Sequence, residues 1–400
     1  FYLRTMVLKL AELMRTNWAG NNERGFLQFK SVYFNAYGPD LTPRVSYDSV
    51  YHPRAVEPLL IYWQITGDKD MEELFTSWMD TWVDAASREE NGKPAGIMPS
   101  AIHWPDGSFS VMGKKWWKPE IYVGDLYGWP SAMGYMTKVL MLTYSMTGDE
   151  KYLEPIRSML RIRIHYAQNP PETDPEPGSA AWCATIGGTY GDGMNSFLPE
   201  TVVKLRALLD ISDYDDLLLQ SNINSYVKMR LGASVEGLED ELEKTVEAFR
   251  INRPSYTSEV RYTDRVLYFN RYWYGDANGW KYPRPDTSLL YSSLTGDPGS
   301  PKYFPMYGVR WLTEPKAFAA LVTRNNTKQF EAQIFHFGDD VRDMGADLYT
   351  LKAGDYRMTL YNEAGKVLSA QDVSIKGTVS RVAFEVPSRT LCRLHVGQKK

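Results

Sequence analysis

The sequence predicts a mainly helical chain that ends in a small antiparallel β-sandwich. Apolar residues recur at three- to four-residue spacing in many segments of residues 1–312, which is the period of amphipathic helices, and long polar, aromatic segments separate them. The tripeptide Thr-Gly-Asp joins such segments at residues 66–68 and 147–149 and occurs again at residues 295–297. After Lys316 the pattern changes to apolar/polar alternation, which is typical of strands. We therefore expect a helical domain over residues 1–312 and a sandwich over residues 316–398.

The chain opens inside an amphipathic helix. Its apolar positions have helical spacing and no capping residue precedes them; they are Leu3, Met6, Val7, Leu10 and Met14. A helix that starts without a cap indicates that the sequence begins inside a longer protein. We therefore expect the N-terminal part of the helical domain to be missing.

Helices are expected in pairs from Pro53 onward. Residues 54–65 pair with 71–86, and residues 130–146 pair with 152–167. At each Thr-Gly-Asp turn, Gly ends one helix in a left-handed conformation, and Asp caps the next helix or turns the chain toward it. The further predicted helices cover residues 198–209, 213–231 and 235–249.

Six short strands are expected in the C-terminal region, separated by Asn-Asn, Glu-Ala-Gly and Lys-Gly turns. They cover residues 317–323, 329–337, 356–361, 367–375, 379–386 and 391–396. The boundary between the two predicted domains lies near residues 312–315.

The composition excludes several classes of protein. No stretch approaches the ~18 uninterrupted apolar residues of a membrane span, and the formal net charge of −4 provides no basic field for nucleic acid. Cys183 and Cys392 lie far apart and outside any Cys/His cluster, so we expect two buried small hydrophobes rather than a disulfide or a zinc site. No motif implies a cofactor or a metal, and the sequence does not indicate an oligomeric state.

Aromatic residues are unusually frequent, and one loop holds many of them. The chain has 27 Tyr and 12 Trp, more than core packing usually recruits, and flat amphipathic rings suit the faces of sugars. The segment 96–130 combines these rings with a histidine and several lysines. Its candidate catalytic residue is His103, and its candidate substrate-binding residues are Trp104, Lys114, Lys115, Trp116, Trp117, Tyr127 and Trp129. The alternative is an ordered surface loop that its aromatic residues hold in place.

Two further segments carry candidate residues. Glycines at 187, 188, 191 and 193 allow the backbone to approach a ligand closely, and we expect Tyr190 and Asn195 to act there. A simple helix cap is the alternative for Asn195. In the segment 256–280, Arg261 beside Tyr262 is the pairing that a β-elimination site needs, because the cation favours the phenolate. Arg265 is a substrate-binding candidate there, and an ion-pair network is the alternative for the whole segment.

Helical hairpins joined at Thr-Gly-Asp turns, long aromatic loops and a terminal β-sandwich together resemble the α/α-toroid carbohydrate-active enzymes. This group includes polysaccharide lyases and six-hairpin glycosidases. The resemblance covers most of the chain and is architectural, because Thr-Gly-Asp is a helix-turn signal without chemistry of its own. It implies an incomplete α/α toroid before the sandwich, a polysaccharide or oligosaccharide substrate, and a periplasmic or secreted location.

Three functions follow as hypotheses. The first is a polysaccharide lyase that cleaves a uronic-acid-containing polymer, sulfated or not, by β-elimination. The second is a glycoside hydrolase with a carboxylate pair, for which Glu120 and Asp125 are the best local pair and Asp276 is another candidate. The third is a non-catalytic glycan-binding protein. The lyase is preferred because Tyr, Arg, Lys and His crowd the loops while no carboxylate pair stands out.

Overall fold

The computed structural model describes residues 2–109, 115–119, 124–188, 191–219, 221, 223–232, 235–252, 286–299 and 306–399. The chain divides into two compact units, Phe1–Thr201 and Val202–Lys400, and each is described by itself. Among the described residues, no helix is long and apolar enough to cross a membrane.

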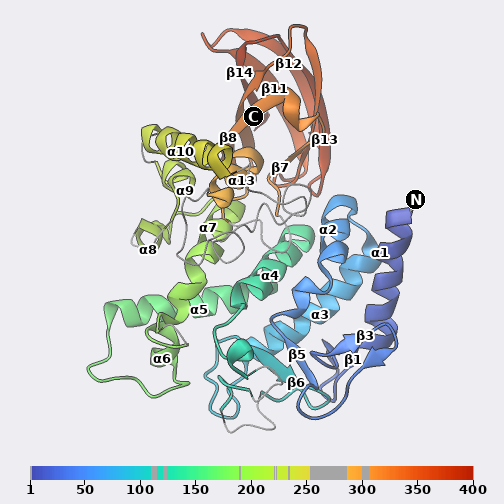
Figure 1. The fold of residues 1–400 in the computed structure, drawn as a ribbon, viewed down its shortest axis with the longest axis vertical. Helices are drawn as coiled ribbons and strands as arrows, with labels where there is room; N and C mark the ends of the chain where they lie inside the picture. The colour runs from blue at the N-terminus through green and yellow to red at the C-terminus, as the bar shows by residue number, and fades with distance from the viewer. Residues whose placement is uncertain are drawn as a thin grey trace. The chain divides into compact units, whose positions relative to one another are not determined.

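The first unit is built on helices that pack against one another in chain order. Figure 1 shows α1, α2, α3 and α4 as neighbours, with the short strands gathered at one end of them. The helices of this unit are α1 (Tyr2–Leu13), α2 (Glu57–Thr66), α3 (Lys69–Ser87), α4 (Met133–Thr147), α5 (Glu154–Gln168) and α6 (Ala180–Ala184). A π-helix, Met14–Trp18, continues α1, and helix α7 (Leu198–Leu209) begins at the end of the unit.

The first two Thr-Gly-Asp turns form as expected. Gly67 and Gly148 are left-handed and end α2 and α4, respectively. Asp68 accepts the Asp70 and Met71 amides at the start of α3. Asp149 accepts the Lys151 amide before α5.

Three short antiparallel strand pairs, which the sequence does not predict, complete the first unit. They are β1 (Ala19–Asn21) with β2 (Leu27–Phe29), β3 (Phe34–Asn35) with β4 (Gly38–Pro39), and β5 (Tyr47–Ser49) with β6 (Ala101–His103). The β5–β6 pair places Tyr47 directly opposite His103. It therefore joins the loop after β6 to the chain that leads into α2.

The second unit contains a helical part and a sheet region. Its helices after α7 are α8 (Asp215–Leu219), α9 (Ser225–Arg230), α10 (Glu236–Asn252) and α13 (Thr287–Thr295). The predicted helix over residues 213–231 is wrong in extent, because two helices form there and Asn224 caps the second through the Val227 amide. Figure 1 shows α13 beside strand β8, with α9 and α10 next to α13.

Two antiparallel sheets in the second unit enclose one apolar core. The three-stranded sheet has the order β13-β10-β7 and the five-stranded sheet the order β12-β11-β14-β9-β8. The strands are β7 (Val309–Trp311), β8 (Phe318–Asn325), β9 (Gln329–His336), β10 (Arg342–Leu348), β11 (Gly354–Asn362), β12 (Val367–Ile375), β13 (Ser380–Val386) and β14 (Leu391–Gln398). Core residues come from both sheets, among them Ala346 and Val382 from the smaller and Phe330 and Leu394 from the larger.

All six predicted strands are present, but β7 and β10 are absent from the prediction. Gly345 and two aspartates interrupt the apolar/polar alternation of β10, and because such residues are common in turns, the sequence does not indicate a strand there.

The predicted domain boundary near residues 312–315 lies inside the second unit. The α/α toroid stays a prediction. Cys183 and Cys392 are both buried free thiols.

Candidate active site

His103, at the end of β6, forms a hydrogen-bonded pair with Asp106. The distance from His103 Nδ1 to Asp106 Oδ1 is 2.9 Å, and the Ser108 amide also donates to Oδ1 at 2.9 Å. Burial raises the pKa of Asp106, but the hydrogen bonds from Ser108 and His103 outweigh burial and hold this pKa below its ordinary value. The ionised carboxylate therefore keeps the proton on Nδ1. Among the described residues no hydrogen bond engages Nε2 of His103, whose side chain is 10% exposed.

The loop that carries this pair is fixed by its backbone. The His103 amide donates to the Ser108 carbonyl at 2.7 Å, and the Gly107 amide donates to the His103 carbonyl at 2.9 Å. Gly107 has φ of +72°, a left-handed conformation that favours glycine, and a Cβ there would have to displace the flexible Arg24 side chain, 2.7 Å away. Trp104 is half-buried in this loop, with Lys30 Nζ 5.8 Å from its ring centroid.

A row of tyrosines lies beside His103. The Tyr47 ring meets the His103 ring edge-on at 5.1 Å and belongs to the same apolar cluster as Tyr127. The Tyr51 ring lies 5.5 Å from Tyr127 and 5.9 Å from Tyr135. The Tyr51 hydroxyl is also hydrogen-bonded to Ser131 at 2.8 Å, which ties the row to the chain before α4.

Arg54 brings a positive charge to this tyrosine row. It ends the 3₁₀ turn His52–Arg54, and its amide donates to the Tyr51 carbonyl. Residues three apart eclipse in a 3₁₀ turn, so Arg54 lies on the side of Tyr51. Burial and the neighbouring Tyr51 raise the pKa of Tyr127, while the Arg54 guanidinium opposes them. The charge of Arg54 therefore acts on Tyr127, although Arg54 itself is exposed.

A buried carboxylate anchors the turn that carries Tyr51 and Arg54. Asp48 Oδ1 lies 2.7 Å from His52 Nδ1, and Oδ2 accepts from Trp78 Nε1 at 2.8 Å and from the Phe29 amide at 3.3 Å. Both Asp48 and His52 are buried, so this pair holds β5 and the turn against α3.

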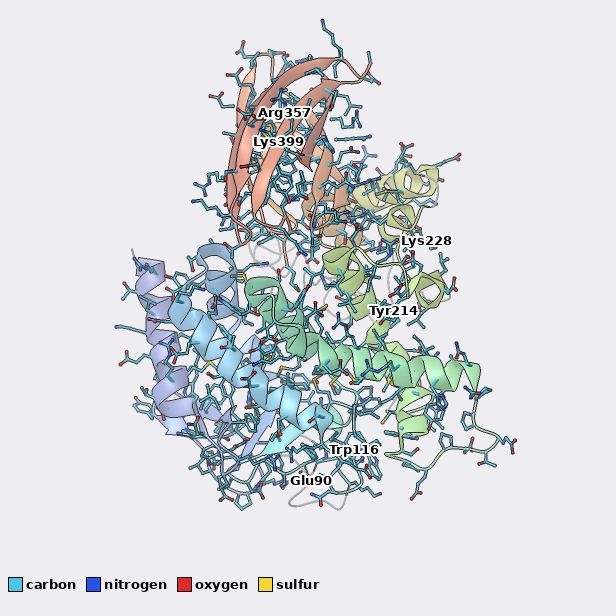
Figure 2. The ribbon with its side chains drawn as sticks, turned by 180° about the vertical axis from the view of Figure 1, so that it is seen from behind. Glu90, Trp116, Tyr214, Lys228, Arg357 and Lys399 are labelled. Atoms are coloured by element: carbon cyan, nitrogen blue, oxygen red, sulfur yellow. The ribbon has the colours of Figure 1, made fainter. Side chains whose placement is uncertain are left out.

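Four tryptophans form a second group of aromatic residues. Trp116 and Trp129 are buried, and their indole nitrogens donate to the Gly178 and Met98 carbonyls. Neighbouring rings cover them at 5.8–6.2 Å. Trp117 and Trp182 are half-buried, and Lys115 Nζ lies 5.9 Å from the Trp117 centroid. Trp117 and Trp182 keep part of their surface open to solvent, whereas Trp116, labelled in Figure 2, and Trp129 are buried.

One short segment links the tryptophan group to His103. Ser100 Oγ donates to the Tyr127 carbonyl at 2.7 Å, and Trp129 Nε1 donates to the Met98 carbonyl at 3.1 Å. The segment before it is pinned by the buried Lys93, whose ammonium donates to the carbonyls of Ala86, Pro94 and Ile97. Residues 98–103 thus run from the tryptophans to the His103–Asp106 pair.

The other predicted site residues are placed differently or lie outside the described residues. Asn195 sits in the 3₁₀ turn Gly193–Ser196, where its Oδ1 accepts from Arg163 Nε at 2.9 Å. Its amide oxygen is therefore occupied by an arginine of α5. Lys114, Glu120, Tyr190, Arg261, Tyr262, Arg265 and Asp276 lie outside the described residues, as does the side chain of Asp125.

Sequence reasoning missed Asp106 as the partner of His103, and it missed Tyr51, Arg54 and Trp182 altogether. Asp106 is three residues after His103, which was a usable signal. Arg54 follows Tyr51 at the same spacing, at the start of a helix. Nothing local indicates that Tyr51 meets Tyr127, because the contact joins distant parts of the chain.

Comparisons with known proteins give weak similarity. No family model matches the chain, and no curated protein matches it. A xyloglucanase of glycoside hydrolase family 44 from Paenibacillus polymyxa is 15% identical, with a TM-score of 0.18, over 22% of this chain and 18% of that one. A putative α-N-acetylgalactosaminidase from Bacillus halodurans is 9% identical, with a TM-score of 0.16, over 23% and 21%. A family 27 β-L-arabinopyranosidase from Geobacillus stearothermophilus is 10% identical, with a TM-score of 0.16, over 25% and 22%.

The matched part spans about a fifth of the length of each of these glycoside hydrolases. TM-scores this low do not establish a shared fold.

Proposed function

We propose that the protein is a carbohydrate-active enzyme, namely a polysaccharide lyase that cleaves a uronic-acid-containing polymer by β-elimination. The observation that carries the proposal is the His103–Asp106 pair, whose imidazole ring meets the first ring of a row of tyrosines on which the charge of Arg54 acts. Base, acid and cation are the three groups that this reaction requires. The incomplete α/α toroid and the periplasmic or secreted location belong to the same proposal.

In the proposed reaction, His103 Nε2 takes the proton from C5 of the uronate. The electron pair of the C5–H bond forms a C4–C5 double bond while the C4–O bond breaks. The departing oxygen takes a proton from a tyrosine, and Tyr127 is the candidate because it shares a cluster with Tyr47, whose ring meets His103. Arg54 neutralises the uronate carboxylate and thereby stabilises the charge that develops at C5.

Asp106 acts as a positioning residue and Trp117 with Lys115 as a substrate platform. Asp106 orients the imidazole and stabilises the imidazolium that forms during proton transfer. Stacking and charge pairing at Trp117 act similarly in ground and transition states, so they support affinity more than turnover.

Absorbance near 232 nm on uronate polymers tests the reaction type, because elimination alone creates the conjugated double bond. His103→Ala and Tyr127→Phe should lower kcat about 10²- to 10⁴-fold. The matched control is His165→Ala, an exposed histidine on α5, which should keep full turnover. Asp106→Asn should shift the pH dependence of kcat/KM as well as lower its maximal value, because Asp106 stabilises the charged form of His103.

Two outcomes would overturn the proposal. Release of reducing ends without the absorbance change would favour the hydrolase. That alternative needs a carboxylic acid with a raised pKa, and its candidates Glu120 and Asp276 lie outside the described residues, as does the side chain of Asp125. Binding without either product on a broad panel of polymers would favour a glycan-binding protein.

A further inference from the structure

A row of charged side chains crosses the outer face of the three-stranded sheet. Arg310 of β7 and Arg381 of β13 are both register partners of Asp347 on β10. The residues next to them, Val309, Leu348 and Val382, belong to the apolar core. Side chains alternate between the faces of a strand, so the charged row points away from the core.

Asp347 is fully engaged by the two arginines. Arg310 Nη2 donates to Oδ2 at 2.7 Å, and Arg381 donates to Oδ1 at 2.9 Å and to Oδ2 at 3.2 Å. Burial raises the pKa of Asp347, but both guanidinium groups outweigh burial and hold it below the ordinary value. One carboxylate between two guanidinium groups leaves a net charge of about +1 on the row.

Two buried donors next to this row have no acceptor. The hydroxyl of Tyr349 and Nε of Arg310 have no hydrogen-bond partner among the described residues. Tyr349 directly follows β10, is 7% exposed, and lies 5.8 Å from the Tyr307 ring. Burial raises the pKa of Tyr349 to about 12 while Arg310 opposes the rise, so the hydroxyl keeps its proton near the guanidinium. An unpaired buried donor costs free energy unless an acceptor reaches it.

A second triad in the same region lacks these donors and provides a contrast. Arg357 and Lys399, both labelled in Figure 2, pair with Asp372 at 3.0 and 2.6 Å. All three side chains are about half exposed, with 54%, 42% and 54% of their surface open. Water satisfies such groups, so this triad needs no further partner.

We propose that Arg310 and Tyr349 bind an oxyanion, a carboxylate or sulfate group, with Arg381 as an outer contact. One oxygen accepts from Arg310 Nε and the other from the Tyr349 hydroxyl, while the net positive charge of the row attracts the anion. The Arg381 and Arg310 side chains are 67% and 32% exposed, so solvent reaches the row, but Arg310 Nε and the Tyr349 hydroxyl are buried and meet an anion only when the side chains over them move. The anion site itself does not depend on the proposed reaction. Its assignment to the acidic groups of a polysaccharide rests on the proposed function.

The test uses the full chain and sodium glucuronate, with sodium chloride at equal ionic strength as the reference. Thermal unfolding is measured for the native protein and for Tyr349→Phe and Arg310→Lys. The native Tm should rise with glucuronate concentration. Both variants should weaken glucuronate binding about 10- to 100-fold, because each removes a hydrogen bond to a charged group.

Without glucuronate, Tyr349→Phe should stabilise the protein, although it weakens glucuronate binding. It removes an unpaired buried hydroxyl, so the Tm in chloride should rise. The matched control is Tyr356→Phe in the core between the two sheets, whose hydroxyl donates to the Thr327 and Lys352 carbonyls. This control should lower the Tm and keep the glucuronate response, and Arg357→Lys should keep the response as well.

The proposal is overturned if the native Tm does not respond to glucuronate or if Tyr349→Phe responds as strongly as the native protein. A lower Tm for Tyr349→Phe in chloride would also overturn it, because the hydroxyl would then have a partner within the fold. Titration with a uronate oligosaccharide separates the two sources of the anion. Tighter binding than glucuronate supports a polymer side group, and equal binding overturns that assignment. Absorbance at 232 nm reports the proposed reaction separately.

Discussion

Two Thr-Gly-Asp turns, residues 66–68 in the first unit and 295–297 in the second, share the same local hydrogen bonds. In both, the Thr hydroxyl donates to the carbonyl four residues earlier, at 2.7 and 2.8 Å. The Asp amide donates back to that hydroxyl at 3.3 Å in each. The glycines are left-handed, with φ of +64° and +70°. The tripeptide therefore specifies the backbone of the turn in two unrelated surroundings.

The aspartates of these two turns have different partners. Asp68 caps α3 and accepts from the Tyr62 hydroxyl at 3.2 Å. Asp297 is buried, pairs with the equally buried Lys204, and accepts from the Tyr291 hydroxyl and from the Met306 amide. The same motif is thus a helix cap in one unit and half of a buried ion pair in the other. Tertiary neighbours, not the tripeptide, decide how much the carboxylate contributes to stability.

The two turns should differ most in the unfolding free energy that they lose when their aspartate is replaced by asparagine. Asp297→Asn leaves the Lys204 ammonium buried without its counter-charge, which should cost about 3–5 kcal/mol of unfolding free energy. Asp68→Asn should be nearly neutral, because Asn caps a helix about as well as Asp. Urea unfolding of both variants measures the difference.

The double variant Lys204→Met/Asp297→Leu provides the control. This variant should lose less unfolding free energy than Asp297→Asn does, because no charge is left unpaired in the interior. Equal losses at the two turns would mean that the buried pair contributes no more than an exposed cap.

These turns also show what sequence reasoning can and cannot reach. The pattern Thr-Gly-Asp predicts the turns and the caps at Asp68 and Asp149, because their partners lie within three residues. It does not reveal the role of Asp297, since Lys204 lies 93 residues away in the chain. Alternation likewise predicts both ends of β12 correctly. It misses β10, because Asp347 there is buried only by pairing with arginines from two other strands.

Some residues of the candidate site can likewise be found from local sequence patterns, and others only from long-range contacts. His103 is identifiable as the one histidine in an aromatic loop, and Asp106 is within reach of local reasoning. The contact of Tyr51 with Tyr127, and hence the place of Arg54, depends on strand pairing between β5 and β6. Trp116 looks like a sugar platform in the sequence, yet its position under other indole rings follows from long-range packing.

Alanine at the two turn glycines should give the next largest difference. A residue with a side chain costs about 1–2 kcal/mol in the left-handed region. Gly67→Ala should therefore lower the free energy of unfolding by about that amount. A Cβ on Gly67 meets nothing within 4 Å, whereas on Gly296 it would lie 2.8 Å from Val322 Cγ1. Gly296→Ala should therefore lose more, by thermal or urea unfolding. A smaller loss at Gly296 would show that β8 shifts to accommodate the methyl group.

The smallest expected effect is the loss of the exposed caps. Asp68→Ala should cost about 1 kcal/mol, because two amides at the start of α3 lose their acceptor. Asp149→Ala removes the acceptor of the Lys151 amide alone, at 3.0 Å, and should cost less. The Lys151 ammonium is unaffected in the main, since Asp80 holds it at 2.8 Å against 3.6 Å for Asp149. Asp68→Asn is the control that restores capping. If Asp68→Ala cost as much as Asp297→Asn, the cap would be more than a local interaction, and the contrast between the two turns would fail.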